Sequence, residues 1–296
     1  MDSLKVAYLG PKGTHTYGAC LKHFGEKTKL GAVNSIPEVF EEVESGAYDY
    51  GVLPIENSSE GAVTHTFDCL MSSPLIICQE IEMKIEHLLV CSPEDISANI
   101  QRVYSHPQAL AQCRQWLRRN FPNASQITSA STILAVEQML GEKGSAAIAS
   151  CHAIDQHELK VLDRAINDQT SNATRFLILG RKIELQASGN DKTSLMLAQE
   201  NRPGSLVKIL LPFADESINL TRIESRPDPA KIWHYVFFVE MDGHLQEPKI
   251  MNVLETLKNQ GVAVKVLGSY PKANKMERRI ARLSAEEKIH RFGRRI

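Results

Sequence analysis

The most informative segment of this chain is Asn172-Ala173-Thr174-Arg175-Phe176-Leu177-Ile178-Leu179-Gly180, which joins a polar start to an apolar run. Its apolar part, from Phe176 onward, predicts a buried strand. The hydroxyl of Thr174 and the guanidinium of Arg175 stand at the mouth of that strand. A rigid element that carries such groups at one end is suited to hold a small anion.

Composition and charge indicate a globular protein with room for two domains. The chain has 296 residues, of which 43% are hydrophobic and 23% are charged, and its net charge is −1. This balance favours neither nucleic acid nor a membrane as a partner, and no apolar run is as long as a bilayer span. The six cysteines lack Cys-x-x-Cys spacing, and the histidines lack ligand spacing. We therefore expect a cytoplasmic protein with reduced thiols and no metal.

Before about residue 185, short apolar segments alternate with amphipathic helices, which is typical of a parallel α/β sheet. One such helix is predicted over Pro37–Glu44, with Ser35 and Glu38 as a capping box. The strands are more numerous than one small sheet needs, so we expect two lobes that face each other across a cleft. The expected strands are Val6–Leu9, Tyr50–Leu53, Leu75–Cys78, Leu88–Cys91, Arg102–Tyr104, Ala146–Ala149 and Phe176–Leu179.

A polar stretch over 186–192 predicts a linker, and a second module follows it. Its elements have the order βαββαβ, which is ferredoxin-like. They are expected at Ser194–Ala198, Gly204–Leu211, Ile218–Glu224, Trp233–Glu240, Lys249–Gln260 and Ala263–Leu267. The end of the chain is basic, with nine Lys/Arg against three Asp/Glu from Lys272 onward, and predicts a solvated helix or frayed terminus.

The segment Gly10-Pro11-Lys12-Gly13-Thr14 follows the first expected strand. Glycines let a backbone approach a ligand closely, and Lys12 with the hydroxyl of Thr14 could meet a carboxylate. The segment lacks the glycine pattern of nucleotide-binding loops, so a nucleotide is not favoured. An ordinary βα turn is the alternative interpretation.

Asn57, Ser58 and Ser59 leave another strand and are expected to enter the helix that carries Phe67 and Leu70. These residue types are natural helix N-caps. The same geometry would also bind an anion, because a helix N-terminus offers free N–H groups. Local sequence leaves both interpretations open.

Ser105-His106-Pro107-Gln108 follows the strand that ends at Tyr104. Ser105 and Gln108 predict a capping box for a helix over Gln108–Asn120, although His106 could also donate to a ligand. Gln112 falls one turn after Gln108, so both amides could face a cleft.

These segments all lie just beyond the carboxyl ends of expected strands, where α/β sheets open their ligand crevices. They offer hydroxyls, amides and a few cations, without a nucleophile–His–acid set. Such chemistry suits binding and polarising a small carboxylate-bearing molecule rather than hydrolysis through a covalent intermediate.

Taken together, the motifs resemble those of the prephenate dehydratase family of the phenylalanine pathway. The matching segments are Gly10–Thr14, Leu53–Ser58, Ser105–Leu110 and Asn172–Phe176, and the second module resembles the family's ACT domain at Pro203–Val207, Asn219–Thr221 and Glu224–Pro227. The resemblance implies an α/β catalytic domain with two lobes and a cleft, like a periplasmic binding protein, over 1–185. After the linker it implies a ferredoxin-like ACT domain over 193–270 and a basic tail over 271–296.

The resemblance also implies a hydro-lyase that converts prephenate to phenylpyruvate, with loss of carbon dioxide and water and with no cofactor. Thr174 would donate to the departing ring hydroxyl, and Arg175 would bind or orient a carboxylate. The other residues implied in catalysis are Asn57, Ser105 and Gln112, and those implied in substrate binding are Lys12, Thr14, Ser58, His106 and Gln108.

The ACT resemblance implies feedback by L-phenylalanine bound between domains of paired subunits, hence a homodimer or homotetramer. The residues implied at that effector site are Gly204, Ser205, Leu206, Asn219, Leu220, Glu224, Ser225 and Arg226. Ser205 adds a hydroxyl where the family commonly has alanine.

Two alternatives stay open. An arogenate dehydratase would act on the aminated analogue, and the local sequence does not separate the two substrates. A non-catalytic sensor would need no hydroxyl donor, so the joint presence of Thr174, Arg175, Asn57 and Ser105 argues against it. No chorismate-mutase-like segment precedes residue 1, which predicts a monofunctional enzyme.

Overall fold

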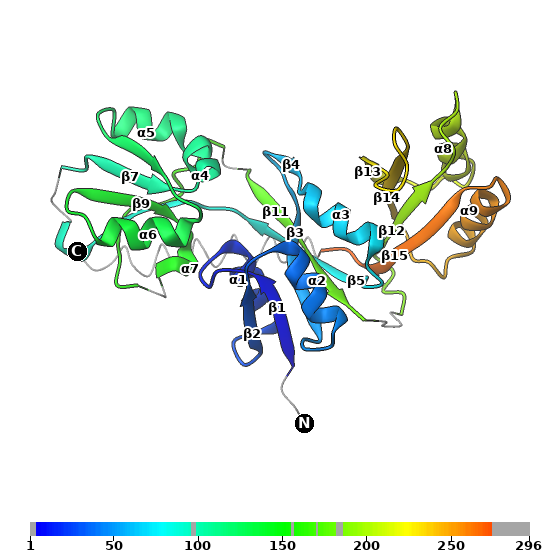
Figure 1. The fold of residues 1–296 in the computed structure, drawn as a ribbon, viewed down its shortest axis with the longest axis horizontal. Coiled ribbons are helices and arrows are strands. Elements are labelled where there is room, and N and C mark those ends of the chain that lie inside the picture. Colours follow the sequence, from blue (N-terminus) through cyan, green and yellow to red (C-terminus); the bar gives the residue numbers. More distant parts are fainter. Residues whose placement is uncertain (1–3, 96–98, 155–156, 170, 182–185, 274–296) are drawn as a thin grey trace.

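The computed structural model describes residues 4–95, 99–154, 157–169, 171–181 and 186–273. Three sheets follow one another along an elongated molecule, with the N-terminal lobe at its centre (Figure 1). The second lobe lies on one side of it and the βαββαβ domain lies on the other. None of the helices within the described ranges is long and apolar enough to cross a membrane.

The first lobe is built on a mixed sheet in the order β2-β1-β3-β11-β5, with β4 paired to β3. β1 runs parallel to β2 and β3, whereas β11 is antiparallel to both β3 and β5. Helices α2 and α3 pack on one face of the sheet and α1 on the other. The bounds are β1 Lys5–Leu9, α1 His15–Phe24, β2 Lys29–Val33, α2 Ile36–Glu44, β3 Tyr50–Asn57, β4 Gly61–Ala62, α3 Thr64–Ser72, β5 Ile76–Lys84 and β11 Ala173–Gly180.

The second lobe is inserted between β5 and β11, so the chain crosses between the lobes twice. Its sheet has the order β10-β6-β9-β7-β8, in which β6 is antiparallel to both of its neighbours. Both lobes therefore contain mixed sheets, and the expectation of a purely parallel sheet is wrong. The bounds are β6 Leu88–Cys91, β7 Arg102–Ser105, α4 Pro107–Gln112, α5 Arg114–Asn120, β8 Ser125–Thr128, α6 Thr132–Leu140, β9 Ser145–Ala149, α7 Cys151–Ile154 and β10 Lys160–Asp163, with a 3₁₀ turn at Pro93–Asp95.

The C-terminal domain has the predicted βαββαβ order and an antiparallel sheet, β13-β14-β12-β15. Its two helices cover one face, and the other face packs against the first lobe through Phe238 and Tyr270. β15 lies so close to β5 that a Cβ on Gly268 would be 2.3 Å from the carbonyl oxygen of Ile77. The bounds are β12 Asp191–Ala198, α8 Ser205–Asp215, β13 Leu220–Pro227, β14 Tyr235–Asp242, α9 Pro248–Asn259 and β15 Ala263–Pro271.

Every expected strand is present, but several short ones carry no clear sequence signal. The missed strands are β2, β4, β8 and β10. They are short, and β8 and β10 lie at the edges of their sheet with partly exposed side chains, so they lack the apolar run of a buried strand.

Several element boundaries and one helix cap differ from the expected ones. The helix expected over Gln108–Asn120 is divided at Cys113, and β12 begins at Asp191, within the expected linker. Ser35 caps α2 as predicted, whereas Glu38 accepts from the N–H of Asn34 instead of Ser35. Most of the expected basic tail, from residue 274 on, lies outside the described residues.

Candidate active site

Thr174 and Asn57 are paired directly across strands β11 and β3. The amide of Asn57 donates to the Thr174 hydroxyl over 2.8 Å and to the Asn172 side-chain oxygen over 3.0 Å. Both paired side chains are buried. Because Thr174 accepts this bond and donates to none of the described residues, its own proton is available to a ligand. The antiparallel pairing explains the geometry, since the amino end of β11 lies beside the carboxyl end of β3.

The polar chain continues from Asn172 to Gln112, in α4 of the second lobe. The amide of Asn172 donates to the side-chain oxygen of Gln112 over 2.9 Å, and Nε2 of His87 lies 2.8 Å from the same oxygen. The amide nitrogen of Gln112 donates in turn to Glu60 over 3.1 Å. Gln112 thus connects the first lobe, the second lobe and the crossing segment between β5 and β6.

Two histidines beside this chain are neutral. Burial lowers the pKa of His87, against the hydrogen bond with Gln112, and burial with the neighbouring His87 and His152 lowers the pKa of His15 to about 3. The rings of His15 and His87 meet edge to face, with centroids 5.9 Å apart. Because Gln112 presents an acceptor oxygen, His87 carries its proton on Nε2. Hydroxyl, amides and histidines therefore form a site region without a fixed cation.

Ser58 joins the ends of the same two strands instead of capping a helix. Its hydroxyl accepts from the N–H of Ala173 over 2.9 Å. α3 begins only at Thr64, and its N-cap, Val63, makes no side-chain bond. The expected helix start at residues 57–59 is therefore wrong, and with it the anion site at that N-terminus. Gly61, at a φ of +84°, turns the chain into β4 instead.

Ser105 is fully buried and donates to the carbonyl of Ile148 over 2.9 Å, so it holds β7 against β9. The capping box predicted for it is wrong. His106 caps α4 instead, with Nδ1 accepting from the N–H of Gln108 over 3.3 Å. Gln108 is partly exposed on the first turn of the same helix.

The loop that holds Lys12 and Thr14 lies against the second lobe. Thr14 caps α1 by accepting from the N–H of Tyr17, and the carbonyl of Gly13 accepts from Ser150 over 2.7 Å. Lys12 is exposed, with its ammonium 5.9 Å from the ring centroid of Tyr17. The loop is thus a βα turn that also carries a cation to the boundary between the lobes.

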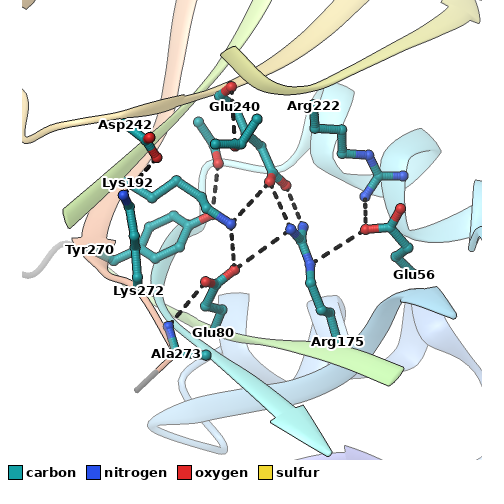
Figure 2. A network of polar contacts seen from close by, with 12 residues as sticks. Glu56, Glu80, Arg175, Lys192, Arg222, Glu240, Asp242, Tyr270, Lys272 and Ala273 are labelled. Atoms are coloured by element: carbon teal, nitrogen blue, oxygen red, sulfur yellow. Dashed lines mark hydrogen bonds and ion pairs between the residues drawn. The ribbon is translucent and has the colours of Figure 1, made fainter. Parts of the chain in front are cut away.

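Arg175 points away from Thr174, because successive residues of a strand face opposite sides of the sheet. Its guanidinium makes two bonds to Glu240 of β14, of 2.9 and 2.6 Å (Figure 2). It also lies 3.5 Å from Glu56 and 3.8 Å from Glu80. The structure therefore places Arg175 at the contact with the C-terminal domain, apart from the other residues implied in catalysis.

A groove of about 210 Å³ opens at the start of α8 in the C-terminal domain. Three of the residues implied at the effector site line it, namely Gly204, Ser205 and Leu206, together with Tyr235 and Phe237. The hydroxyl of Ser205 donates to the carbonyl of Glu200 over 2.9 Å, so it stabilises the loop before the helix.

The other residues implied at the effector site lie away from this groove. Arg226 donates to Asp68 of α3 over 2.8 Å, and Asn219 donates to Asp242 over 3.0 Å. Glu224 lies 3.7 Å from Arg222, Leu220 packs beside the domain core, and Ser225 is exposed. The groove within one chain is therefore formed by the loop before α8, the start of α8 and the first residues of β14.

Sequence reasoning missed Asn172, Glu60 and His87 as parts of this region. Asn172 had a usable signal, because it precedes Thr174 by two residues and so shares its side of the strand. Glu60 and His87 had none, since their roles depend on where α4 of the other lobe is placed.

A two-lobed α/β domain with a buried polar chain between its lobes, joined to a βαββαβ domain, defines a small-molecule enzyme with a regulatory module. The family model described as prephenate dehydratase matches residues 6–184, and the ACT domain model matches residues 193–259. The chain belongs to the prephenate dehydratase family, hydro-lyases of phenylalanine biosynthesis, and carries an ACT domain. The fold class, family and function expected from the sequence motifs are confirmed.

Relatives support this assignment over most of the chain. A bifunctional chorismate mutase/prephenate dehydratase of Pseudomonas aeruginosa is 46% identical over 91% of this chain and 74% of its own length. A prephenate dehydratase of Amycolatopsis methanolica is 36% identical over 91% of this chain and 89% of its own. The crystal structure of the Arthrobacter aurescens prephenate dehydratase in complex with L-Phe superposes with a TM-score of 0.85, at 33% identity, over 91% of this chain and 90% of that one.

Proposed function

We propose that Thr174 is the hydrogen-bond donor to the leaving hydroxyl when this chain converts prephenate to phenylpyruvate. In that reaction the bond to the ring carboxylate breaks, its electron pair completes the aromatic ring, and the ring hydroxyl departs with a proton as water. The observation that carries the proposal is the 2.8 Å bond from Asn57 to the Thr174 hydroxyl, which directs the Thr174 proton away from Asn57. Because a threonine hydroxyl is a poor acid, it positions or relays the proton supplied to the leaving group.

Neutral groups hold this donor, and a cation stands at the edge of the region. Asn172, Gln112 and His87 fix Asn57 through the hydrogen bonds described above. Lys12 supplies a positive charge for a substrate carboxylate, and its exposure leaves it free to move toward one. We propose that the reaction needs no metal or cofactor, since aromatisation itself drives decarboxylation.

The test is phenylpyruvate formation from prephenate, in the presence of a chelator, by wild type, Thr174→Ala and Thr174→Ser. We expect Thr174→Ala to lose about 10²–10³-fold in kcat, as when a single oxyanion donor is removed, with substrate binding retained in calorimetry. Thr174→Ser keeps the hydroxyl and should keep much of the activity. Full turnover by Thr174→Ala would remove Thr174 from the mechanism. A wild type that binds prephenate without turnover would instead be a sensor.

Arogenate is assayed in parallel, because the geometry of the described site does not distinguish the two substrates. We expect the larger kcat/KM for prephenate, since the matching relatives are prephenate dehydratases. A larger value for arogenate would assign the chain to the aminated substrate.

The groove at α8 is proposed to bind L-phenylalanine. The first turn of α8 offers backbone N–H groups to a carboxylate, and Tyr235 and Phe237 offer rings to an aromatic side chain. A solved relative holds this ligand. Binding should lower turnover in a titration with L-phenylalanine, and unchanged turnover and thermal stability would exclude it as the effector.

A homodimer or homotetramer through the ACT domains is proposed as well. Large apolar side chains are exposed around the groove, including Val207 at 59%, Ile232 at 84% and Trp233 at 79%. A second copy that covers them would also close the groove. Light scattering of the purified chain tests this, and a monomer at working concentration would exclude it. The six cysteines carry thiols instead of disulfides, which supports a reducing compartment such as the cytoplasm.

A further inference from the structure

The strand pair β3 and β11 carries two different pairs of side chains at neighbouring register positions. Thr174 faces Asn57, and the next pair along the strands is Arg175 with Glu56. The first pair lies on the side of the polar chain and the second on the side of the ACT domain. Residues that hold the ACT domain are thus one peptide bond away from the proposed hydrogen-bond donor and from its partner.

The second pair is held almost entirely by ACT residues. Arg175 is bound through both terminal nitrogens by Glu240, and Glu56 accepts from Arg222 over 3.3 Å (Figure 2). Bidentate bonds of this kind fix the plane of a guanidinium as well as its position. The side chains of Glu240 and Arg222 are each only 8% exposed, so water does not replace these contacts readily.

These contacts belong to one balanced network, in which carboxylates and cations alternate. Lys192 of β12 lies 2.9 Å from Glu80 and 3.3 Å from Glu240, and Glu80 also neighbours Arg175. Burial raises the pKa of the Glu240 carboxyl, but the charge and hydrogen bonds of Arg175 outweigh it and keep that pKa below its usual range. The network members are Glu56, Glu80, Arg175, Lys192, Arg222 and Glu240.

A bulge in β3 interrupts its pairing with β11 beside these residues. Arg175 pairs with Glu56, whereas Phe176 pairs with Pro54, so Ile55 is an extra residue in β3. Bulges interrupt the ladder and re-aim the side chains beside them. The bulge therefore lies in β3, next to Glu56 and Asn57, whereas β11 pairs with β5 without interruption from Ala173 to Ile178.

We propose that Glu240 and Arg222 of the ACT domain are positioning residues for the reaction, acting through Arg175 and Glu56 on the Thr174–Asn57 pair. The inference rests on the proposed role of Thr174 as donor. It assigns to Arg175 a protein carboxylate as its partner, in place of a substrate carboxylate. Any ligand that shifts β14 relative to the first lobe would alter the site by this route, because the Arg175–Glu56 and Thr174–Asn57 pairs lie on the same two strands.

The first test is Glu240→Gln, which keeps the shape of the side chain and removes its charge. We expect kcat to fall tenfold or more, since small displacements of reacting groups cost about 10²-fold, with KM changed less than twofold. Asp68→Asn is the matched control. It removes another ion pair between the ACT domain and the first lobe, the 2.8 Å contact with Arg226, but from α3 instead of the strand pair. Its kcat should stay near wild type.

A double-mutant cycle with Arg175→Gln separates positioning from substrate binding. If Glu240 acts through Arg175, the double variant is no worse in kcat than the poorer single variant. A large rise in KM for Arg175→Gln alone would show that Arg175 binds substrate and would overturn the inference. So would a folded Glu240→Gln with wild-type kcat and an unchanged response to L-phenylalanine.

If Glu240→Gln does not fold, as judged by circular dichroism, Glu56→Gln gives the same test at the more exposed end of the network, where the carboxylate is 34% exposed. We expect a smaller fall in kcat, and a wild-type kcat there would also overturn the inference. The Thr174→Ala variant distinguishes the two failures. Full activity in it rejects the donor, whereas loss of activity in it beside an unaffected Glu240→Gln rejects only the positioning role.

Discussion

The two sides of the strand pair β3 and β11 differ in the kind of interaction that they use. On the neutral face, defined by Asn57, Thr174, Asn172, Gln112 and His87, the contacts that join these five residues are directional hydrogen bonds between uncharged groups, and the carboxylate of Glu60 meets only its exposed end. On the charged face, the network around Arg175 consists of buried ion pairs. Thr174 and Arg175, which are adjacent in sequence, therefore take part in different kinds of interaction.

The difference follows from what each face has to hold. Uncharged donors and acceptors fix the direction of a single proton, and they leave the local charge to be set by the substrate. Buried ion pairs hold two groups together and resist separation, because an unpaired charge in the interior is costly. We therefore expect the chemistry on the neutral face, whereas the ACT domain is attached on the other.

A negative charge placed on the neutral face by Asn57→Asp should have the largest effect on turnover. Aspartate keeps the acceptor that receives the N–H of Ser59 but loses the donor to Thr174. The Thr174 hydroxyl would then donate to the new carboxylate instead of to the leaving group. We expect kcat to fall by about 10²–10³-fold, measured as phenylpyruvate formation. A variant with near wild-type kcat would show that the direction of the Thr174 proton does not matter.

Removing a charge from the charged face should affect stability. Lys192 is 7% exposed and neutralises both Glu80 and Glu240. Lys192→Met leaves those carboxylates with too little positive charge, and we expect the free energy of unfolding to fall by about 3 kcal/mol in urea titrations.

Lys272→Met is the control, because Lys272 pairs with Asp242 at 2.6 Å but both side chains are about a third exposed. Its effect should be within about 1 kcal/mol. If Lys192→Met and Lys272→Met lowered the free energy of unfolding equally, burial of the network would add nothing to the stability that an exposed ion pair gives.

Much of this arrangement could be predicted from the sequence, but the partner of Arg175 could not. The apolar run after Thr174 identified β11, and the polar motifs at strand ends identified Asn57 and Gln112 as site candidates. The alternation of a strand implies that Thr174 and Arg175 face opposite ways. What faces Arg175 depends on how the ACT sheet packs on the first lobe, a contact between residues 65 positions apart in the chain.

The same limit explains the errors at Asn57–Ser59 and Ser105. Serine and asparagine cap helices and also bond to neighbouring strands, and local sequence does not choose between these roles. Ser58 bonds across to Ala173, and Ser105 bonds across to Ile148, each through a partner fixed only by the sheet. Capping was predicted correctly where the helix start was unambiguous, as at Ser35.

Acid should destabilise the fold slightly through His15, a neutral histidine beside the neutral face, and this is the smallest of the expected effects. The pKa of His15 is lowered to about 3, mainly by burial, from an ordinary value of 6.5. Between these values the unfolded chain binds a proton that the folded chain excludes. The resulting stability is therefore complete above pH 6.5 and is lost progressively as the pH falls toward 3.

His15→Asn removes this titration, so the test compares the two proteins at pH 7 and pH 5.5. From the shift of the His15 pKa, the free energy of unfolding of the wild type should fall by about 1 kcal/mol more than that of the variant. His87 titrates in both proteins and cancels in the difference, since its lowered pKa is common to them. If the difference in free energy of unfolding between wild type and variant is the same at both pH values, His15 takes up its proton in the folded chain as readily as in the unfolded one. The neutral face would then carry a charge at its edge at pH 5.5.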